Sequence, residues 1–201
     1  IRTPLNAIVG FSRIMAETSD NEERRTYYSI VEDNNERLLG LVNEILDLSK
    51  IESGIMEFER SPLKMTEVRE DSINTMSWRC PKGVELIYEP SDANMVIFCD
   101  RSRLFQVFIN LISNSIKFTT EGSIRFGYNK IQGFVEFFVK DTGKGISPDK
   151  LEKVFDRFVK ADNFTQGTGL GLSICKSIVE RMGGDISVSS RIGSGTCFSF
   201  R

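Results

Sequence analysis

Apolar residues recur at helical spacing through the first quarter of the chain. Two such patterns run from residue 1 to about residue 53, and the polar run 18–23 separates them. Each pattern places apolar side chains along one seam, at Leu5, Ile8 and Met15 in the first and at Val31, Leu38, Leu41, Ile45 and Leu48 in the second, where Asn34 is the polar exception. The sequence therefore predicts a helical hairpin.

A hairpin of this size is too small to bury both seams by itself. Pairing with a second copy into a four-helix bundle is the simplest completion, so we expect a homodimer through this segment. The alternative is a helical arm that folds back on the rest of its own chain, since heptads also occur within single chains. A hydrodynamic mass distinguishes the two arrangements.

A change of pattern after Gly54 marks a domain boundary. Short apolar and alternating runs then mix with amphipathic helical ones. We expect helices at 65–79, 102–118, 151–158 and 170–182, and strands at 85–88, 95–99, 123–128, 134–139, 186–188 and 197–200. The predicted fold class is therefore α+β, with a helical hairpin at 1–54, a linker at 55–62 and an α/β sandwich domain at 63–201.

Composition narrows the possible functions. The 201 residues are 40% hydrophobic and 27% charged, and no apolar run approaches the roughly 20 residues of a membrane-spanning helix, so we expect no membrane contact by this segment. The net charge of −2 and the scattered basic residues argue against nucleic acid as a partner. The four cysteines form no paired motif and histidine is absent, which argues against a zinc site and against imidazole chemistry within these residues.

Asn110, Asn114 and Lys117 form the first candidate site. Offsets of four and three residues place them on one face of the predicted helix. Neutral amide oxygens suit Mg²⁺ that is shared with phosphate oxygens, and an ammonium group suits the phosphate itself. Taken singly, each asparagine would more often cap or cross-link the backbone, but the joint spacing favours a nucleotide site.

A glycine-bearing loop follows the strand predicted at 134–139. Gly143 and Gly145 allow the backbone to turn tightly and to approach a planar ligand. The carboxylate of Asp141 can accept a hydrogen bond from the exocyclic amine of adenine. The simpler interpretation is an ordinary turn between a strand and a helix.

A second glycine-bearing loop contains Gly167, Gly169 and Gly171. It leads into the helix predicted at 170–182, whose first amide groups can face phosphate oxygens. The spacing matches neither the P-loop nor the dinucleotide-binding pattern. A flexible linker would explain the loop alone, but not the other two motifs.

Together these residues resemble the ATP-binding domain of sensor histidine kinases. Residues 110–119 resemble the N box, 141–145 the first glycine box, 155–158 the F box, 167–172 the second glycine box and 193–196 the terminal one. The resemblance covers about residues 61–201 and implies the sandwich fold that histidine kinases share with gyrase and chaperone ATPases. It also implies ATP and Mg²⁺ as cofactors, with Asn114 and Asn110 as metal ligands.

The resemblance assigns the remaining site residues. It implies that Arg157 reaches the γ-phosphate and that residues 160–167 close over the nucleotide. It implies further nucleotide contacts from Phe118, Ile146, Phe158, Thr168, Leu170, Leu172 and Thr196, beside those of Lys117, Asp141 and the glycines.

The opening residues resemble the end of the histidine-kinase H box. Residues 2–5 match its Arg-Thr-Pro-Leu, so the phosphoacceptor histidine would lie two residues before Ile1 and is missing from this chain. The resemblance therefore implies a fragment that binds nucleotide but is inactive in autophosphorylation. Thr3 would place water for dephosphorylation of a partner regulator, although a helix cap or a bend is its simpler role.

The function implied is that of the catalytic core of a dimeric, two-component histidine protein kinase. Such an enzyme phosphorylates its own histidine and passes the phosphate to an aspartate on the receiver domain of a response regulator. We expect a cytoplasmic location, as that of a soluble kinase or of the inner part of a membrane-anchored sensor. The alternative is an ATP-binding conformational scaffold without phosphotransfer, and the residues upstream of Ile1 would discriminate the two.

Overall fold

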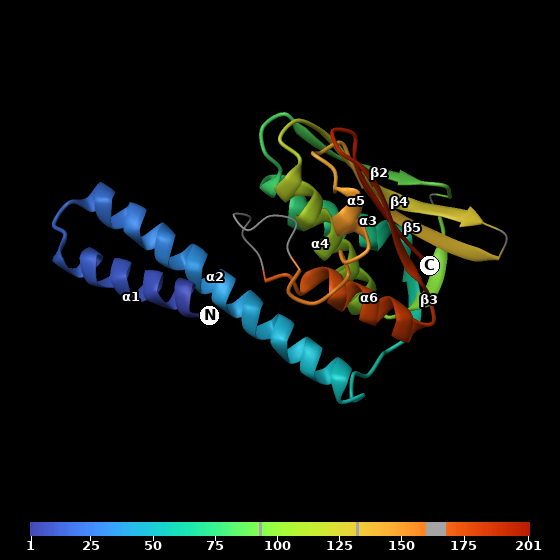
Figure 1. Cartoon of the computed structure of the whole chain (residues 1–201), viewed down its shortest axis with the longest axis horizontal. Helices are drawn as coiled ribbons and strands as arrows, with labels where there is room; N and C mark the ends of the chain where they lie inside the picture. Colours follow the sequence, from blue (N-terminus) through green and yellow to red (C-terminus); the bar gives the residue numbers. More distant parts are fainter. Residues whose placement is uncertain (93, 132, 160–167) are drawn as a thin grey trace. The chain divides into compact units, whose positions relative to one another are not determined.

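The computed structural model describes residues 1–92, 94–131, 133–159 and 168–201 (Figure 1). The chain divides into two compact units, Ile1–Met56 and Glu57–Arg201. No helix within these described ranges is long and apolar enough to span a bilayer.

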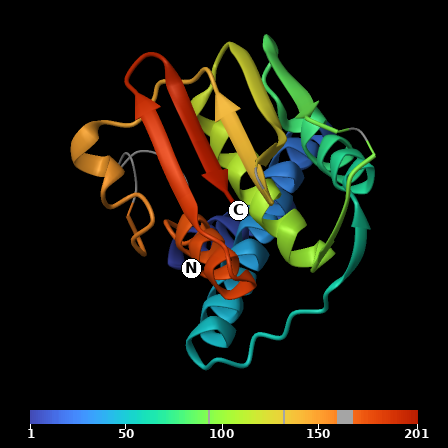
Figure 2. The same cartoon turned by 90° about the vertical axis from the view of Figure 1, so that its right-hand side faces the viewer.

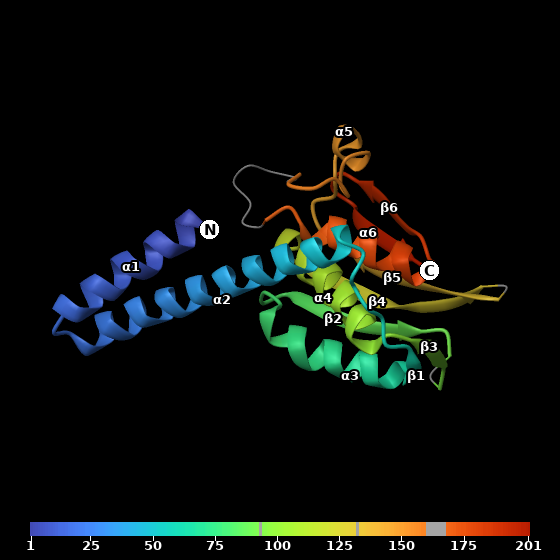
Figure 3. The same ribbon diagram turned by 90° about the horizontal axis from the view of Figure 1, so that it is seen from below.

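The first unit is the predicted helical hairpin. Helices α1 (Arg2–Glu17) and α2 (Asn21–Glu52) lie side by side (Figures 1 and 3). Phe11 of α1 stacks on Tyr27 of α2, with ring centroids 5.8 Å apart. Ile8 and Met15 are partly covered, whereas the seam residues Leu5 and Ile45 are exposed. Apolar side chains along the hairpin therefore remain open to a further partner.

Asp20 sets the start of α2. Its carboxylate accepts hydrogen bonds from the backbone N–H groups of Glu22 at 2.7 Å and Glu23 at 3.2 Å. Asp20→Ala is therefore expected to lower the free energy of unfolding of this unit by about 1 kcal/mol. Chemical unfolding followed by helical circular dichroism measures the change, and Ser19→Ala is the matched control at the adjacent exposed position. Equal midpoints for the two variants would contradict the capping role.

The second unit contains a five-stranded sheet in the order β2-β4-β5-β7-β6 and a two-stranded ribbon of β1 and β3. Its strands are β1 (Ser61–Lys64), β2 (Val84–Pro90), β3 (Val96–Cys99), β4 (Gly122–Ile131), β5 (Phe134–Asp141), β6 (Ile186–Arg191) and β7 (Gly195–Phe200). Its helices are α3 (Met65–Met76), the short 3₁₀ turn η1 (Ser77–Arg79), α4 (Arg101–Phe118), α5 (Pro148–Leu151) and α6 (Gly171–Met182). Strand β2 pairs with β4 in parallel, and the other neighbouring strands pair antiparallel.

Helices α3, α4 and α6 pack against one face of the large sheet (Figure 2). The core is aromatic where α4 meets the strands. The fully buried Phe108 lies 5.9 Å from Phe126, 5.8 Å from Phe137 and 5.5 Å from Phe200 between ring centroids, all in tilted or edge-on contact. This packing holds α4 across the middle of the sheet.

The predicted α+β class and most of its elements are confirmed. The structure shows the helices expected at 65–79, 102–118 and 170–182, and the strands expected at 123–128 and 134–139 pair antiparallel as β4 and β5. The strand β1 was not predicted. It begins at the end of the predicted linker 55–62, and it adopts extended structure because Leu63 is buried while β1 pairs with β3.

The helix predicted at 151–158 is wrong. Only Pro148–Leu151 is α-helical, and the chain then continues in turns. Phe158 has a positive φ of 62°, and its N–H donates a hydrogen bond of 2.8 Å to the carbonyl of Gly169. This contact with a distant loop replaces the bond that a continued helix would need.

Candidate functional site

Asp141 lies at the end of β5 and is only 4% exposed. Its Oδ1 accepts hydrogen bonds from the N–H groups of Gly143 at 2.9 Å and Thr196 at 3.1 Å, and its Oδ2 accepts one from the Ser115 hydroxyl at 3.0 Å. Burial raises the pKa of the Asp141 carboxyl above its usual value, and these three hydrogen bonds oppose the rise. The carboxylate is thus held in one orientation, with acceptor capacity left on Oδ2.

The glycines after Asp141 leave no room for side chains. A Cβ at Gly143 would lie 2.4 Å from the Phe118 carbonyl oxygen, and one at Gly145 would lie 2.2 Å from that of Arg191. Gly145 also has a φ of +72°, which favours glycine. The backbone therefore packs closely against the end of α4 and against the turn after β6.

Ile146 and Thr196 are linked through a serine. The N–H of Ile146 donates to the Ser190 hydroxyl oxygen at 2.8 Å, and the Ser190 and Thr196 hydroxyl groups lie 2.9 Å apart. Two predicted motifs are thus joined beside Asp141, since the N–H of Thr196 also bonds to its carboxylate.

Helix α4 carries Asn110, Asn114 and Lys117, as predicted. Asn110 and Asn114 are half-buried, and Lys117 is exposed. The side-chain amide carbon of Asn110 lies 3.9 Å from the position of a Cβ at Gly171, the first residue of α6. Ser115, on the next turn, bonds to Asp141. One helix therefore connects the end of β5 with the start of α6.

The loop before α6 is ordered by Thr168 and Gly169. The Thr168 hydroxyl oxygen accepts a hydrogen bond from the N–H of Leu170 at 3.0 Å. Gly169 has a φ of +75°, and a Cβ there would lie 2.8 Å from the Cα of Phe158. Leu170 is buried and Leu172 half-buried. The F-box and second glycine-box residues thus lie in contact, whereas Gly167 and the closing segment predicted at 160–167 fall outside the described residues.

Two predicted catalytic residues are not brought to this site by the described contacts. Arg157 is exposed in the turns after α5. Thr3 lies in the first turn of α1, within the other unit. Their assigned roles remain predictions.

Ser115, Ser190 and Thr119 belong to the site but were missed as functional residues. The two serines belong to no recognisable sequence motif. Their hydrogen bonds join α4 to β5 and β6 to the loop after β5, and these contacts depend on the fold. The Thr119 hydroxyl oxygen is buried beside Gly143 and has no hydrogen-bond partner among the described residues. A buried polar atom of this kind calls for a ligand or a water molecule.

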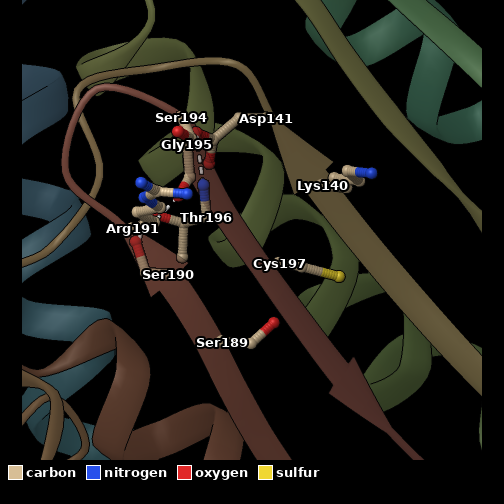
Figure 4. Close-up of a pocket in the computed structure, with 9 residues that line it drawn as sticks. All are labelled: Lys140, Asp141, Ser189, Ser190, Arg191, Ser194, Gly195, Thr196 and Cys197. Carbon is tan, nitrogen blue, oxygen red and sulfur yellow. Dashed lines mark hydrogen bonds between the residues drawn. The ribbon is translucent and has the colours of Figure 1, made fainter.

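A hollow of about 310 Å³ lies at the ends of β5, β6 and β7 (Figure 4). Its lining consists of Lys140, Asp141, Ser189, Ser190, Arg191, Ser194, Gly195, Thr196 and Cys197. Asn110, Asn114 and Lys117 do not line it. It shares only Asp141 and Thr196 with the predicted nucleotide site, so it is not the cleft expected from the sequence.

Two family models match the chain. The model for the histidine kinase-, DNA gyrase B- and HSP90-like ATPase matches residues 99–201. The model for the His Kinase A (phospho-acceptor) domain matches residues 1–54. The two matches fall largely in the second and first structural units, respectively.

Characterised relatives include the autoinducer 2 sensor kinase/phosphatase LuxQ of Vibrio harveyi, which is 38% identical over 98% of this chain. Hybrid signal transduction histidine kinase A of Dictyostelium discoideum is 35% identical over the same share. This chain spans only 24% of the first protein and 10% of the second.

Solved structures agree with these relatives. Full-length ShkA in complex with AMPPNP is 33% identical, with a TM-score of 0.80 over 99% of this chain and 42% of that one. Histidine kinase ThkA in complex with the response regulator protein TrrA is 28% identical, with a TM-score of 0.74 over 99% of this chain and 57% of that one. The chain therefore belongs to the histidine kinase-, DNA gyrase B- and HSP90-like ATPase family, and its two family matches together are those of a sensor histidine kinase catalytic core.

Proposed function

We propose that this chain binds Mg²⁺-ATP between α4, α6 and the loop after β5, and that it phosphorylates a histidine of its own protein. The single observation that carries this proposal is the buried Asp141 carboxylate, fixed by Ser115, Gly143 and Thr196. Its remaining acceptor capacity suits the exocyclic amine of adenine, which supplies both orientation and choice of base.

The residues around Asp141 fit a planar base. Gly143 packs against the backbone of Phe118, where a side chain would clash, and the buried Thr119 hydroxyl beside it has no hydrogen-bond partner among the described residues. The AMPPNP complex of the similar ShkA supports a nucleoside triphosphate as the ligand. Adenine would therefore lie against the Asp141 carboxylate, with its phosphates toward α6.

The phosphate end fits a divalent cation. Asn110 lies beside the first residue of α6, one turn from Asn114 along α4. Among the described residues no group of three acidic, cysteine or histidine side chains could hold a metal alone. Amide oxygens of Asn114 and Asn110 would share Mg²⁺ with the triphosphate, and Lys117 would neutralise further phosphate charge. When bound, the cation supplies charge neutralisation at the transferring phosphoryl group.

The partners follow from the first unit. We infer that the hairpin forms a homodimer, because it leaves apolar residues such as Leu39, Val42 and Leu46 exposed and matches a phospho-acceptor model. The ThkA complex with a response regulator supports a receiver domain as the acceptor of the phosphate. In this proposal Arg157 acts at the γ-phosphate, and Thr3 places the water that dephosphorylates the regulator.

An asparagine at position 110 favours phosphotransfer over hydrolysis. Related gyrase-type and chaperone-type ATPases place an acidic residue near this offset to activate water, and an amide cannot accept a proton as a carboxylate does. The scaffold function without phosphotransfer predicts the same nucleotide site, so only an assay of chemistry separates the two.

The test is to extend the chain with Ser-His-Glu before Ile1 and to supply Mg²⁺-ATP labelled at the γ-phosphate. We expect acid-labile, base-stable label on the extended protein, and none on the original chain, which contains no histidine. ATP binding without labelling would support the scaffold instead. Failure of the extended chain to bind ATP would remove the nucleotide site itself.

A further inference from the structure

We propose that Lys144 is a second phosphate-binding cation of this site, alongside Lys117; this inference rests on the proposed function. Lys144 lies between the two glycines of the loop after β5, a position to which the sequence patterns assign no role. The proposal follows from where its ammonium group is held.

The backbone of Lys144 is fixed at two points. Its N–H donates to the carbonyl of Phe118 at 3.2 Å, and its carbonyl accepts a hydrogen bond from Gly193 at 2.9 Å. The adjoining Gly143 allows this approach because a Cβ there would lie 2.4 Å from the same Phe118 oxygen. The Cα atom of Lys144, from which its side chain extends, therefore lies beside the end of α4.

Two ammonium groups converge on the Phe118 ring. The Nζ atom of Lys144 lies 4.9 Å from the ring centroid, and that of Lys117 lies 5.5 Å from it. Each contact is a favourable cation–π interaction. The two cations come from different elements, α4 and the loop after β5. Residues that are distant in the sequence therefore place positive charge beside one ring.

This gathering of charge favours a polyanion. An anion that binds beside this ring can be attracted by an ammonium group from either element. Both lysine side chains are exposed, so a ligand can reach them. The triphosphate is the polyanion that the proposed function brings to this end of α4. We therefore expect Lys144 to increase the affinity for phosphate groups and to contribute little to recognition of the base.

Lys140 is the matched control. It is also an exposed lysine near the end of β5, immediately before Asp141, but strand alternation directs it to the opposite side from the Asp141 carboxylate. It lines the hollow of Figure 4 instead. Replacing Lys140 removes the same charge from the same strand end without touching Phe118.

The experiment measures the affinities of the whole chain for ATP and adenosine by calorimetry at low salt. Lys144→Met is expected to weaken ATP binding about fivefold, as for one exposed ion pair, and to leave adenosine binding unchanged. Lys144→Arg keeps the charge and should retain most of the ATP affinity. Lys140→Met should behave as the wild type for both ligands.

The outcomes separate this inference from the proposed function. If the wild-type chain binds no ATP, the proposed function fails. If the wild type binds ATP but Lys144→Met binds it equally well, only the role of Lys144 is overturned. An equal loss for ATP and adenosine would also overturn it, because the side chain would then act on the base. Equal losses of ATP affinity in Lys144→Met and Lys140→Met would also overturn it, because the loss would then reflect the net charge of the chain and not the position of Lys144.

Discussion

Asp141→Asn is expected to weaken ATP binding about 100-fold while leaving the fold intact. The asparagine oxygen can still accept the hydrogen bonds from Gly143 and Thr196, and its amide can donate to the Ser115 hydroxyl. Toward the ligand, however, an N–H donor replaces the acceptor and meets the amine of adenine. Calorimetry gives the affinity, and thermal unfolding shows whether the internal hydrogen bonds persist.

Two controls make this result specific to base recognition. The 6-oxo base of inosine triphosphate accepts a hydrogen bond, so the variant should lose far less affinity for it, and selectivity should reverse. Asp149→Asn, at the start of α5, changes an exposed carboxylate and should leave ATP binding unaltered. Wild-type affinity for ATP in Asp141→Asn would contradict the assignment of the base site.

The pH dependence of adenosine binding follows from the same carboxylate. Burial raises the pKa of Asp141, so acidification protonates it at a higher pH than it would an exposed aspartate. Adenosine affinity should therefore fall as the pH decreases through that raised pKa, since the protonated group loses its acceptor role. The dependence should be absent in Asp141→Asn.

The elements that the sequence predicts well are those whose own periodicity decides their structure. Helix α4 repeats buried residues along one face, at Leu104, Phe108, Leu111 and Ser115. The spacing of these residues in the sequence therefore predicts both the helix and the face that it buries. Strand β1 and the turns after α5 have no such pattern. Their conformations depend on pairing with β3 and on the bond from Phe158 to Gly169, which join residues distant in the sequence.

The candidate site divides in the same way. Asp141, Asn110 and the glycines are candidates from the sequence alone because their chemistry is unusual at those spacings, and their roles remain predictions. Ser115, Thr119 and Lys144 could not, because each is an ordinary residue whose role depends on a neighbour from another element. Ser115 was overlooked although it lies between Asn114 and Lys117, since a serine on a helix has no distinct signal of its own.

Asn114→Ala is expected to abolish the effect of Mg²⁺ on ATP affinity and to reduce labelling of the histidine-extended chain by at least about 100-fold. The side chain lies on α4 between Asn110, which lies near the start of α6, and Ser115, which bonds to Asp141. Removing its amide oxygen takes away the proposed metal ligand and leaves the hydrogen bonds of Asp141 in place. Calorimetry with Mg²⁺ and with chelator, followed by the labelling assay, measures the two effects.

The chelator condition separates a metal ligand from a structural residue. Without Mg²⁺, Asn114→Ala and the wild type should bind ATP equally, because the contacts from Asp141 and Lys117 remain. Asn114→Asp should keep Mg²⁺ dependence, since it retains a hard oxygen ligand. Ser113→Ala, at the adjacent exposed position of α4, should match the wild type throughout. Loss of ATP affinity in chelator would show that Asn114 supports the fold of the site, and the metal would then have to be held by Asn110 and the phosphates alone.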